Sequence, residues 1–312
     1  MKSLPSRNAR PRALACPASL KGVLSARDAA AALAEGLREW SEADELPVAD
    51  GGEGSLDALH AALGGEWRTY DVHDAFGRPR RARTVWDGAG VTVEAAEVIP
   101  LDPGRLDPIA ASSHGLGELI AALGRPRELL VCLGGTANVD GGAGLLEALP
   151  ELPAPTRVAC DVDVPLIDAV RVFAAQKGAT GEQLPELEAR LAPLAAYADL
   201  PGAGAAGGLG AAFASLGAEL RPGARMILDL LRLDPTRYDV VVTGEGTVDA
   251  TTAHGKAPGE VAHRCREVGV RCVVFGGRVV QPVAGVETVA LSGDPAQAGD
   301  DLRRLGRLCA PR

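Results

Sequence analysis

Residues 129–142, with the sequence LLVCLGGTANVDGG, combine the signals of a strand and of a turn. Leu129–Leu133 is a short, uniformly apolar run, which is typical of a buried strand in a parallel sheet. The run ends in two glycines, and Asn138, Asp140 and two further glycines follow before an expected helix. A strand, a glycine-rich turn and a helix in this order predict one βα unit of an α/β fold.

The same alternation of strand and helix is expected near both ends of the chain. At the beginning, strands are expected at Ala13–Cys16 and Glu45–Ala49, with a helix from Ser25 towards Trp40 between them. Near the end, the apolar strand 238–243 is followed by a helix from residue 257 and a strand at 271–275. This order predicts a parallel, doubly wound sheet to which both ends of the chain contribute.

The middle of the chain predicts a different arrangement. Three β-rich stretches, Trp67–His73, Arg80–Trp86 and Val91–Val98, are separated by short loops that contain glycine. Such loops predict an antiparallel meander. We therefore expect a parallel-sheet domain made of residues 1–65 and 237–312, with a second α/β domain, residues 66–236, inserted into it.

The composition narrows the class of partner and the compartment. The chain has 312 residues, a formal net charge of −9 and only 3% aromatic residues, which argues against a nucleic-acid partner. No apolar run approaches the length of a membrane helix, so no membrane partner is expected. The six cysteines contain no C-x-x-C pair and favour core thiols in the cytoplasm. Whether the chain forms a homodimer stays open.

Glycine-rich turns carry the acidic residues that suggest chemistry. Asp50 and Glu53 follow an expected strand and begin a helix, where the amides of Gly51 and Gly52 could bind an anion. Helix capping explains these two carboxylates about equally well when they are taken alone. In the 134–142 turn, consecutive amides could hold a phosphate while Asp140 holds a metal ion or accepts a proton.

Two further turns have acidic residues at suggestive spacings. Asp161 and Asp163 are two residues apart on an expected extended segment, so a divalent cation could relieve their repulsion. A solvated strand end is the alternative. Glu245 and Asp249 follow an apolar strand, and Lys256 stands just before a helix, which suits an anionic ligand better than it suits helix stability.

These turns, in this order, resemble the bacterial glycerate kinase family of the glycerate 2-kinase type. The resemblance begins at Cys16–Ala26, which is similar to the family's A-P-D-S-F-K-G-S-L-S-A, and it extends over nearly the whole chain. The other matching segments are Asp50–Gly54, Glu94–Ala96, Gly134–Gly142, Cys160–Leu166, Phe173, Gln176–Ala179, Gly202–Gly210, Thr243–Asp249 and Gly255–Pro258.

The resemblance implies a two-domain α/β enzyme with a flavodoxin/Rossmann-like domain. It further implies that this enzyme uses ATP and Mg²⁺ to phosphorylate glycerate, and the 2-hydroxyl is the expected position. It implies charge stabilisation by Lys21 and Lys256, and Asp140 is the candidate acceptor of the substrate proton. Asp161, Asp163 and Asp249 are the candidate metal ligands. The implied substrate- and nucleotide-binding residues are Ser19, Asp50, Gly51, Gly52, Glu53, Gly134, Gly135, Thr136, Lys177 and Glu245.

Several residues depart from the family pattern. Ala18 replaces an aspartate, Val139 and Val164 replace asparagines, and Thr247 stands where a basic or small residue is usual. Lost polar groups in ligand loops would remove hydrogen bonds worth about 0.5–1.5 kcal/mol each. A non-catalytic homologue that binds a nucleotide or a hydroxy acid is therefore the alternative. A nicotinamide-dependent dehydrogenase would suit the sheet, but the G-x-G-x-x-G fingerprint is absent from the sequence.

Overall fold

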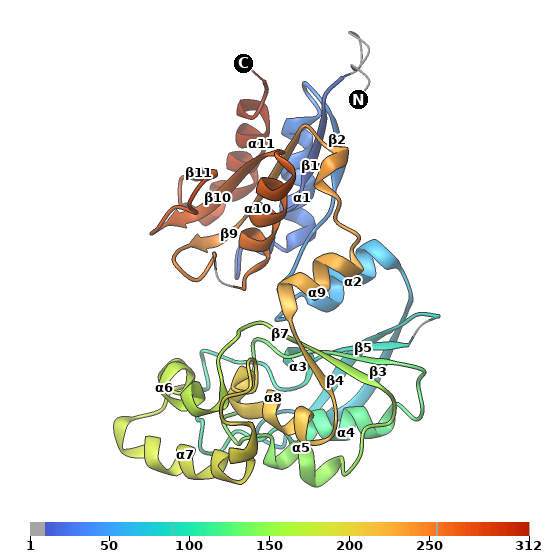
Figure 1. Ribbon diagram of the computed structural model, residues 1–312, viewed down its shortest axis with the longest axis vertical. Helices are drawn as coiled ribbons and strands as arrows, with labels where there is room; N and C mark the ends of the chain where they lie inside the picture. Colours follow the sequence, from blue (N-terminus) through green and yellow to red (C-terminus); the bar gives the residue numbers. More distant parts are fainter. Residues whose placement is uncertain (1–9, 89, 254, 312) are drawn as a thin grey trace. The chain divides into compact units, whose positions relative to one another are not determined.

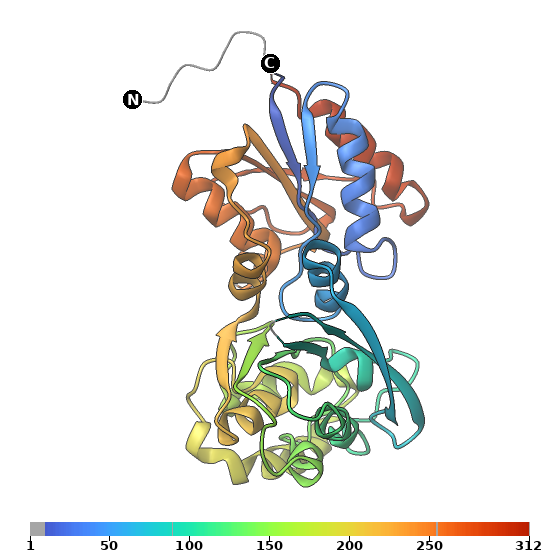
Figure 2. The same ribbon diagram turned by 90° about the vertical axis from the view of Figure 1, so that its right-hand side faces the viewer.

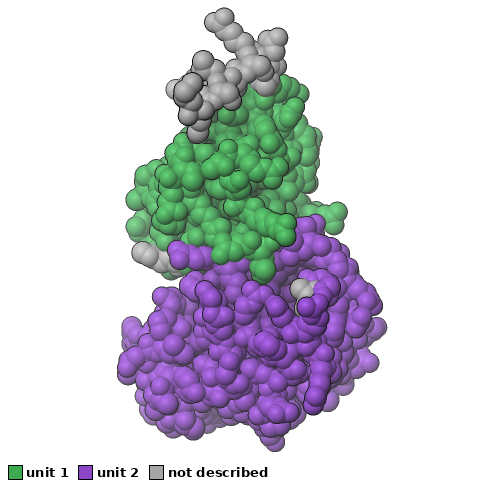
Figure 3. Space-filling model, turned by 45° about the vertical axis from the view of Figure 1, so that its right-hand side comes forward, with its two compact units in different colours: residues 1–49, 228–312 green, residues 50–227 purple. Residues whose placement is uncertain are grey.

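The computed structural model describes residues 10–88, 90–253 and 255–311 and divides into two compact units (Figure 1). Unit 1 is made of Met1–Ala49 and Leu228–Arg312, and unit 2 of Asp50–Ile227; Figure 3 colours them separately. Both units combine helices with parallel strands, so the α/β class predicted from the sequence is confirmed. The sequence predicted one domain of residues 1–65 and 237–312 and another of residues 66–236. These domain boundaries stay a prediction, because the two units are defined by packing alone.

Unit 1 is built on a five-stranded parallel sheet with the strand order β11-β10-β9-β1-β2. Helices α1 and α11 lie on one face of this sheet and α10 on the other (Figure 2). The elements are β1 (Arg12–Ala15), α1 (Ala26–Leu37), β2 (Glu42–Glu45), β9 (Val240–Val248), α10 (Ala257–Val268), β10 (Arg271–Val279), β11 (Glu287–Ala290) and α11 (Ala298–Leu308).

The second strand of unit 1 does not lie where the sequence predicted it. It was expected at Glu45–Ala49, whereas β2 is Glu42–Glu45. The sequence EADE has no apolar alternation, but an edge strand needs little burial, and β2 lies at the edge of the sheet. Beyond it, Leu46 and Val48 still donate backbone hydrogen bonds to Ala15 and Pro17, while Pro47 has no N–H to donate.

Helices α1 and α11 approach closely because glycines face each other at their contact. A Cβ atom on Gly36 would overlap the carbonyl oxygen of Arg303, and one on Gly306 would lie 2.6 Å from the carbonyl oxygen of Leu33. The indole N–H of Trp40 also donates to the carbonyl oxygen of Gly306 at 2.8 Å. The two helices therefore cover the sheet as one tightly packed layer.

Gly36→Ala is expected to lower the free energy of unfolding by about 1–3 kcal/mol, because the new methyl group forces α1 and α11 apart. Urea unfolding would measure the loss. Gly299→Ala in α11 is the matched control: its Cβ would meet the Arg303 guanidinium at an ordinary 3.4 Å. That change should be neutral or stabilise the helix by about 0.5–1 kcal/mol. Equal effects of the two substitutions would contradict this account of the contact.

Unit 2 is built on a six-stranded mixed sheet with the order β3-β4-β5-β6-β7-β8. Its strands are β3 (Glu66–His73), β4 (Pro79–Trp86), β5 (Val91–Glu94), β6 (Leu129–Cys132), β7 (Thr156–Cys160) and β8 (Glu219–Pro222). Its helices are α2 (Ser55–Leu63), α3 (Ala95–Val98), α4 (His114–Ala122), α5 (Ala143–Ala148), α6 (Ala169–Phe173), α7 (Leu184–Leu191) and α8 (Ala205–Ser215); α9 (Gly223–Leu230) crosses the boundary to unit 1.

The antiparallel meander predicted for residues 66–98 is confirmed, since β3 pairs with β4 and β4 with β5 in antiparallel register. Its third strand ends at Glu94, earlier than the predicted Val98, because the chain turns into the short helix α3. From β5 to β8 the strands are parallel. Their carboxyl ends therefore lie along one edge of the sheet, where ligands collect in α/β folds.

Candidate active site

In unit 1, the direction of chain connection reverses between β1 and β9. From β1 the chain continues to β2 on one side, and from β9 it continues to β10 and β11 on the other. Open α/β sheets bind ligands outside the carboxyl ends of the strands at such a switch point. The segment after β1 and the last part of β9 are therefore the candidate ligand loops of this unit.

These two segments contact each other directly. The backbone N–H of Ala18 donates to the carbonyl oxygen of Gly244 at 2.9 Å, and the hydroxyl of Thr243 donates to the carbonyl oxygen of Cys16 at 2.6 Å. Lys21 is exposed, and its backbone nitrogen would lie 3.6 Å from a Cβ on Gly246. A ligand at the switch point would thus meet both segments at once.

Glu245 closes the turn that follows. Only 8% of this residue is exposed. One carboxylate oxygen accepts the Thr252 hydroxyl at 2.7 Å, and the other accepts the ammonium of Lys256 at 3.2 Å. Because Lys256 is also the N-cap residue of α10, these contacts place its charge at a helix N-terminus, where an anion is stabilised by backbone N–H groups and by the helix dipole.

Asp249 forms a tight local turn next to this pair. Its Oδ1 atom accepts the hydroxyl of Thr251 at 2.6 Å and the backbone N–H of the same residue at 2.8 Å. The hydrogen bond from the Thr251 hydroxyl is the main cause that lowers the pKa of Asp249, against a smaller effect of burial. The group is therefore a carboxylate at neutral pH, with oxygen donors of the kind that Mg²⁺ prefers.

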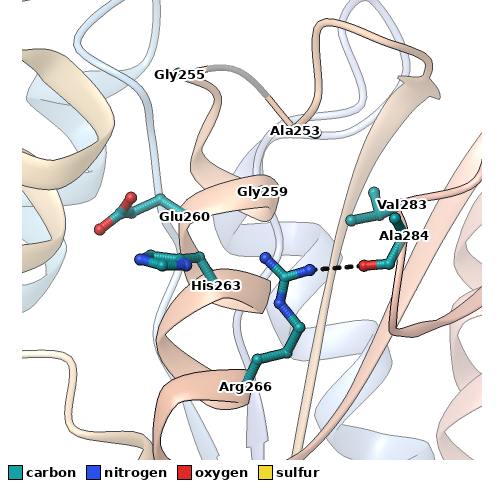
Figure 4. A pocket seen from close by; sticks show the side chains of 8 residues that line it. All are labelled: Ala253, Gly255, Gly259, Glu260, His263, Arg266, Val283 and Ala284. Carbon is teal, nitrogen blue, oxygen red and sulfur yellow. Dashed lines mark hydrogen bonds between the residues drawn. The ribbon is translucent and has the colours of Figure 1, made fainter.

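A small pocket of about 220 Å³ borders the same turn (Figure 4). It lies between the first turns of α10 and the segment Val283–Ala284, beside Ala253. The guanidinium of Arg266 crosses it and donates to the carbonyl oxygen of Ala284 at 2.7 Å. The volume is below that of pockets that enclose a whole ligand, so it would accept only part of one.

In unit 2, the turns at the carboxyl ends of neighbouring strands pack against the turn Asp50–Gly54. The backbone N–H of Gly134 donates to the carbonyl oxygen of Gly51 at 3.2 Å. A Cβ on Gly134 would lie 2.5 Å from a carboxylate oxygen of Asp161 and 2.6 Å from the Cα of Gly52. Only glycine therefore fits at position 134, and its presence brings the three turns together.

Asp140 lies inside this assembly rather than on its surface, with 6% of the residue exposed. Its Oδ1 atom accepts the Asn138 amide at 2.9 Å and the Gly142 N–H at 3.0 Å. Its Oδ2 atom accepts the backbone N–H and the hydroxyl of Ser113 at 2.8 and 2.7 Å, and the Gly144 N–H at 3.3 Å. Five donors occupy the roughly four acceptor positions of a carboxylate. This geometry fits an anchor of the 134–142 turn better than the predicted proton acceptor.

Lys177 is also buried, with 4% of the residue exposed, and its ammonium donates to the carbonyl oxygen of Asn138 at 2.7 Å. Burial lowers the pKa of Lys177 to about 8, while the charges of Asp161 and Asp140 act in the opposite direction. The ammonium therefore holds the 134–142 turn from the inside. The predicted contact of Lys177 with substrate or nucleotide stays a prediction.

Glu94 was not among the predicted site residues, although the segment Glu94–Ala96 contributed to the resemblance. It is the last residue of β5 and is 4% exposed. Its two carboxylate oxygens accept the backbone N–H groups of Gly54 and Leu56 at 3.0 and 2.9 Å. Within the described ranges 10–88, 90–253 and 255–311, the buried charged residues are Glu94, Asp140, Lys177 and Glu245. Glu94, Asp140 and Lys177 belong to, or bind, one of the glycine-rich turns, while Glu245 lies in β9.

The other predicted carboxylates of unit 2 are less buried than Asp140. Glu53 and Asp163 are exposed, and Asp50 and Asp161 are partly buried. Asp50 accepts the N–H of Gly52 at 3.2 Å. Among the described residues the buried hydroxyl of Thr136 has no hydrogen-bond partner, which is the condition of a group that binds water or a ligand. The structure thus brings the predicted residues together in two sets: Ser19, Lys21, Glu245, Asp249 and Lys256 in unit 1, and Asp50–Glu53, Gly134–Thr136, Asp140, Asp161, Asp163 and Lys177 in unit 2.

The predicted metal ligands belong to different units, Asp161 and Asp163 to unit 2 and Asp249 to unit 1. Within the part of the chain that the structure describes, no three or more His, Cys, Asp or Glu side chains are grouped to hold a metal ion. Magnesium in phosphoryl-transfer enzymes uses one or two carboxylates together with substrate phosphates. Asp161 fits this mode, because its carboxylate borders a cradle that a Cβ on Gly134 would fill.

No helix of the described residues has the length and apolarity needed to cross a membrane.

Comparison with known proteins agrees with this two-unit α/β enzyme architecture. The profile of the "Glycerate kinase family" matches residues 13–151 and 153–293. The "Glycerate 2-kinase" of Escherichia coli K12 is 34% identical over 86% of each chain, and the "Glycerate kinase" of Bacillus subtilis 168 is 33% identical over 84% of each. A crystal structure from Salmonella typhimurium LT2, assigned as glycerate kinase 2, has a TM-score of 0.78 at 29% identity and covers 96% of this chain and 97% of its own.

The chain therefore belongs to the glycerate kinase family and is an enzyme of that family. The predicted resemblance is confirmed. One departure from the family pattern now has a structural reason. Val139 is fully buried in the hydrophobic core of unit 2, so its side chain does not face a ligand. Thr247 is exposed, and Ala18 and Val164 are partly buried. Nothing in the structure explains these three substitutions.

Proposed function

We propose that this chain transfers the γ-phosphoryl group of ATP to the 2-hydroxyl of glycerate and forms 2-phosphoglycerate, with Mg²⁺ bound. The observation that carries the proposal is the 34% identity to the glycerate 2-kinase of E. coli over 86% of each chain. The hydroxyl oxygen forms a bond to the γ-phosphorus, the bond from this phosphorus to the β–γ bridging oxygen breaks, and the hydroxyl proton passes to solvent water. ADP is the second product.

The turns of unit 1 suit the polyphosphate. Phosphoryl transfer requires positioning and neutralisation of charge rather than covalent chemistry by the protein. We assign charge stabilisation to Lys21 and Lys256, since the first is exposed beside Gly246 and the second caps α10. Glu245 fixes the ammonium of Lys256 by the 3.2 Å contact. Ser19, in the segment after β1, is a further candidate binding residue.

The turns of unit 2 suit a small hydroxy acid. We assign glycerate to the amides of Gly51, Gly52, Gly134 and Gly135, with the hydroxyl of Thr136 as a further donor. Asp140 and Lys177 hold the second of these turns. Magnesium, when bound, would neutralise phosphate charge. Carboxylates of Asp161, Asp163 or Asp249 would hold it, while Asp50 and Glu53 orient the substrate.

A coupled assay tests the function. Purified chain with ATP, Mg²⁺ and D-glycerate is expected to release ADP, and ³¹P NMR is expected to show 2-phosphoglycerate. Formation of 3-phosphoglycerate would contradict the proposed position but leave the kinase activity. A folded sample that releases no ADP, yet is thermally stabilised by ATP or glycerate, would instead support the non-catalytic alternative. The buried position of Val139 removes one of the reasons for that alternative.

We also propose a cytoplasmic location. Six buried cysteines are present as free thiols, which suits a reducing compartment. Fractionation of the producing cell, followed by immunodetection, would test this proposal.

A further inference from the structure

Helix α2 begins without a cap of its own. Its N-cap residue is Gly54, which has a φ of +90° and no side chain to accept the first N–H groups of the helix. The carboxylate of Glu94, 40 residues along the chain, takes this role: Oε1 accepts the Gly54 N–H at 3.0 Å and Oε2 accepts the Leu56 N–H at 2.9 Å. One buried side chain therefore satisfies two helix N–H groups that would otherwise lack a partner.

Glu94 also connects two turns of the candidate substrate site. Gly54 ends the turn that carries Asp50 and Glu53. The Glu94 carboxylate, which accepts the Gly54 N–H, therefore fixes the end of that turn. Ala96 follows Glu94 by two residues, and its Cβ lies 3.4 Å from the position that a Cβ on Gly135 would take. The Cβ of Glu53 lies 3.3 Å from the same position. A shift of the Glu94 carboxylate would therefore move the Asp50–Gly54 turn against the 134–142 turn.

We propose that Glu94 is a positioning residue of the reaction: as a carboxylate it holds the Asp50–Gly54 turn in the geometry that binds glycerate, and its protonation loosens that turn. The inference rests on the proposed function and adds a residue and a proton dependence to it. A charged acceptor forms stronger hydrogen bonds to backbone N–H groups than a neutral carboxyl does. The proton comes from solvent and resides on one Glu94 oxygen.

The surroundings of Glu94 place this protonation near neutral pH. Burial raises the pKa of Glu94 to about 7, the hydrogen bonds from Leu56 and Gly54 lower it, and the charges of Glu97 and Asp57 raise it further. Those two carboxylates are themselves paired with Arg83, and the nearby Cys132 thiol stays protonated because burial raises its pKa. Glu94 therefore changes charge around pH 7.

Two readouts respond to Glu94 in opposite directions. Its folded pKa lies above the ordinary value of 4.5, so the folded state binds more protons between about pH 4.5 and 7. The contribution of Glu94 to stability therefore falls as pH rises through this window. The hold on the turn strengthens over the same rise, so kcat/KM for glycerate should increase while this stability contribution decreases. A residue with only a structural role would change stability alone.

The first experiment measures kcat and KM for glycerate from pH 5.5 to 9 at saturating MgATP, in wild type and in Glu94→Gln. The amide cannot ionise and turns an NH₂ group towards one of the two N–H donors. We expect kcat/KM for glycerate to fall about 10–100-fold at pH 8, as for a small misplacement of a site, and to lose its rise through pH 7. KM for ATP should change less than about twofold. Glu118→Gln is the control, because Glu118 also accepts a backbone N–H, that of His73 at 3.0 Å, on another part of unit 2.

The ionisation of ATP affects both proteins alike, so the readout is the ratio of kcat/KM for glycerate in wild type to that in Glu94→Gln at each pH. A ratio that stays constant from pH 5.5 to 9 would overturn the proposal, even if the variant is less stable. A second measurement needs no variant. In wild type, hydrogen exchange of the Gly54 and Leu56 amides, corrected for the intrinsic pH effect, should be faster at pH 6 than at pH 8.

Equal corrected exchange at the two pH values would also overturn the proposal. If the wild type phosphorylates no glycerate at any pH, the proposed function fails, and the exchange measurement alone decides whether Glu94 controls the turn. The two failures can therefore be told apart.

Discussion

Asp140→Ala is expected to lower the free energy of unfolding by about 3–5 kcal/mol, because it removes a buried charge from five donors. The donors come from Ser113, Asn138, Gly142 and Gly144, so the loss reaches the start of α4, the 134–142 turn and the start of α5. Buried N–H groups without an acceptor cost free energy that the alanine cannot recover. Urea unfolding followed by circular dichroism would measure the change.

Asp107→Ala is the matched control. Asp107 also accepts backbone N–H groups, those of Ile109 and Ala110 at 3.2 and 3.0 Å, but it lies in an exposed turn of the same unit. Its loss should cost about 1 kcal/mol or less, as for an exposed cap. Asp140→Asn separates the two roles considered for Asp140. A variant as stable as wild type but reduced about 10⁴-fold in kcat would support the proton acceptor and contradict the anchor.

The turns at 50–54 and 134–142 could be predicted from sequence because the signal is local, whereas residues 244–248, also predicted as part of a turn, continue the strand β9. An apolar run followed by glycines and a carboxylate is readable within about ten residues, as in Leu129–Asp140. The end of a parallel strand then places such a turn at the ligand-binding edge of its sheet. Asp161 and Gly134 contact each other for this reason, although 27 residues separate them along the chain.

The roles of the buried charges could not be predicted in the same way. Asp140 looks like a catalytic carboxylate in sequence, because nothing nearby shows that Ser113 and Gly144 occupy its oxygens. Glu94 was missed as a site residue because it caps a helix that begins 39 residues earlier in the chain. Besides the match of Glu94–Ala96 to the family pattern, the sequence signal for it is an acidic residue at the end of an apolar strand, where a carboxylate needs a partner.

Departures from the family pattern were also hard to judge from sequence. The valine at 139 was expected to remove a polar group from a ligand loop, yet its side chain is in the core. A turn residue can face inward or outward, and only packing decides which. The strand β2 was hard to predict for a different reason. Its sequence is polar and gives no strand signal, yet its four residues pair regularly with β1.

Lys256→Met is expected to lower kcat about 10²–10³-fold with little change in KM for glycerate, because a charge that stabilises the transition state contributes little to ground-state binding. The ammonium stands at the N-terminus of α10, where Glu245 fixes it and the helix dipole adds to its field. Steady-state kinetics of the purified variant, with the fold verified by circular dichroism, would measure the effect. Lys256→Arg keeps the charge and should recover most of the rate.

Arg307→Met removes a cation of the same unit that pairs with Glu39 at 3.3 Å on the outside of α11, so kcat should stay within twofold of wild type. A general loss of positive charge would instead reduce both variants. If Lys256→Met keeps the wild-type kcat, the ammonium serves only to neutralise the buried Glu245, and Lys21 becomes the cation to test. Removal of Lys256 would then lower stability, since one oxygen of Glu245 would keep the Thr252 hydroxyl while the other would lose its charged donor.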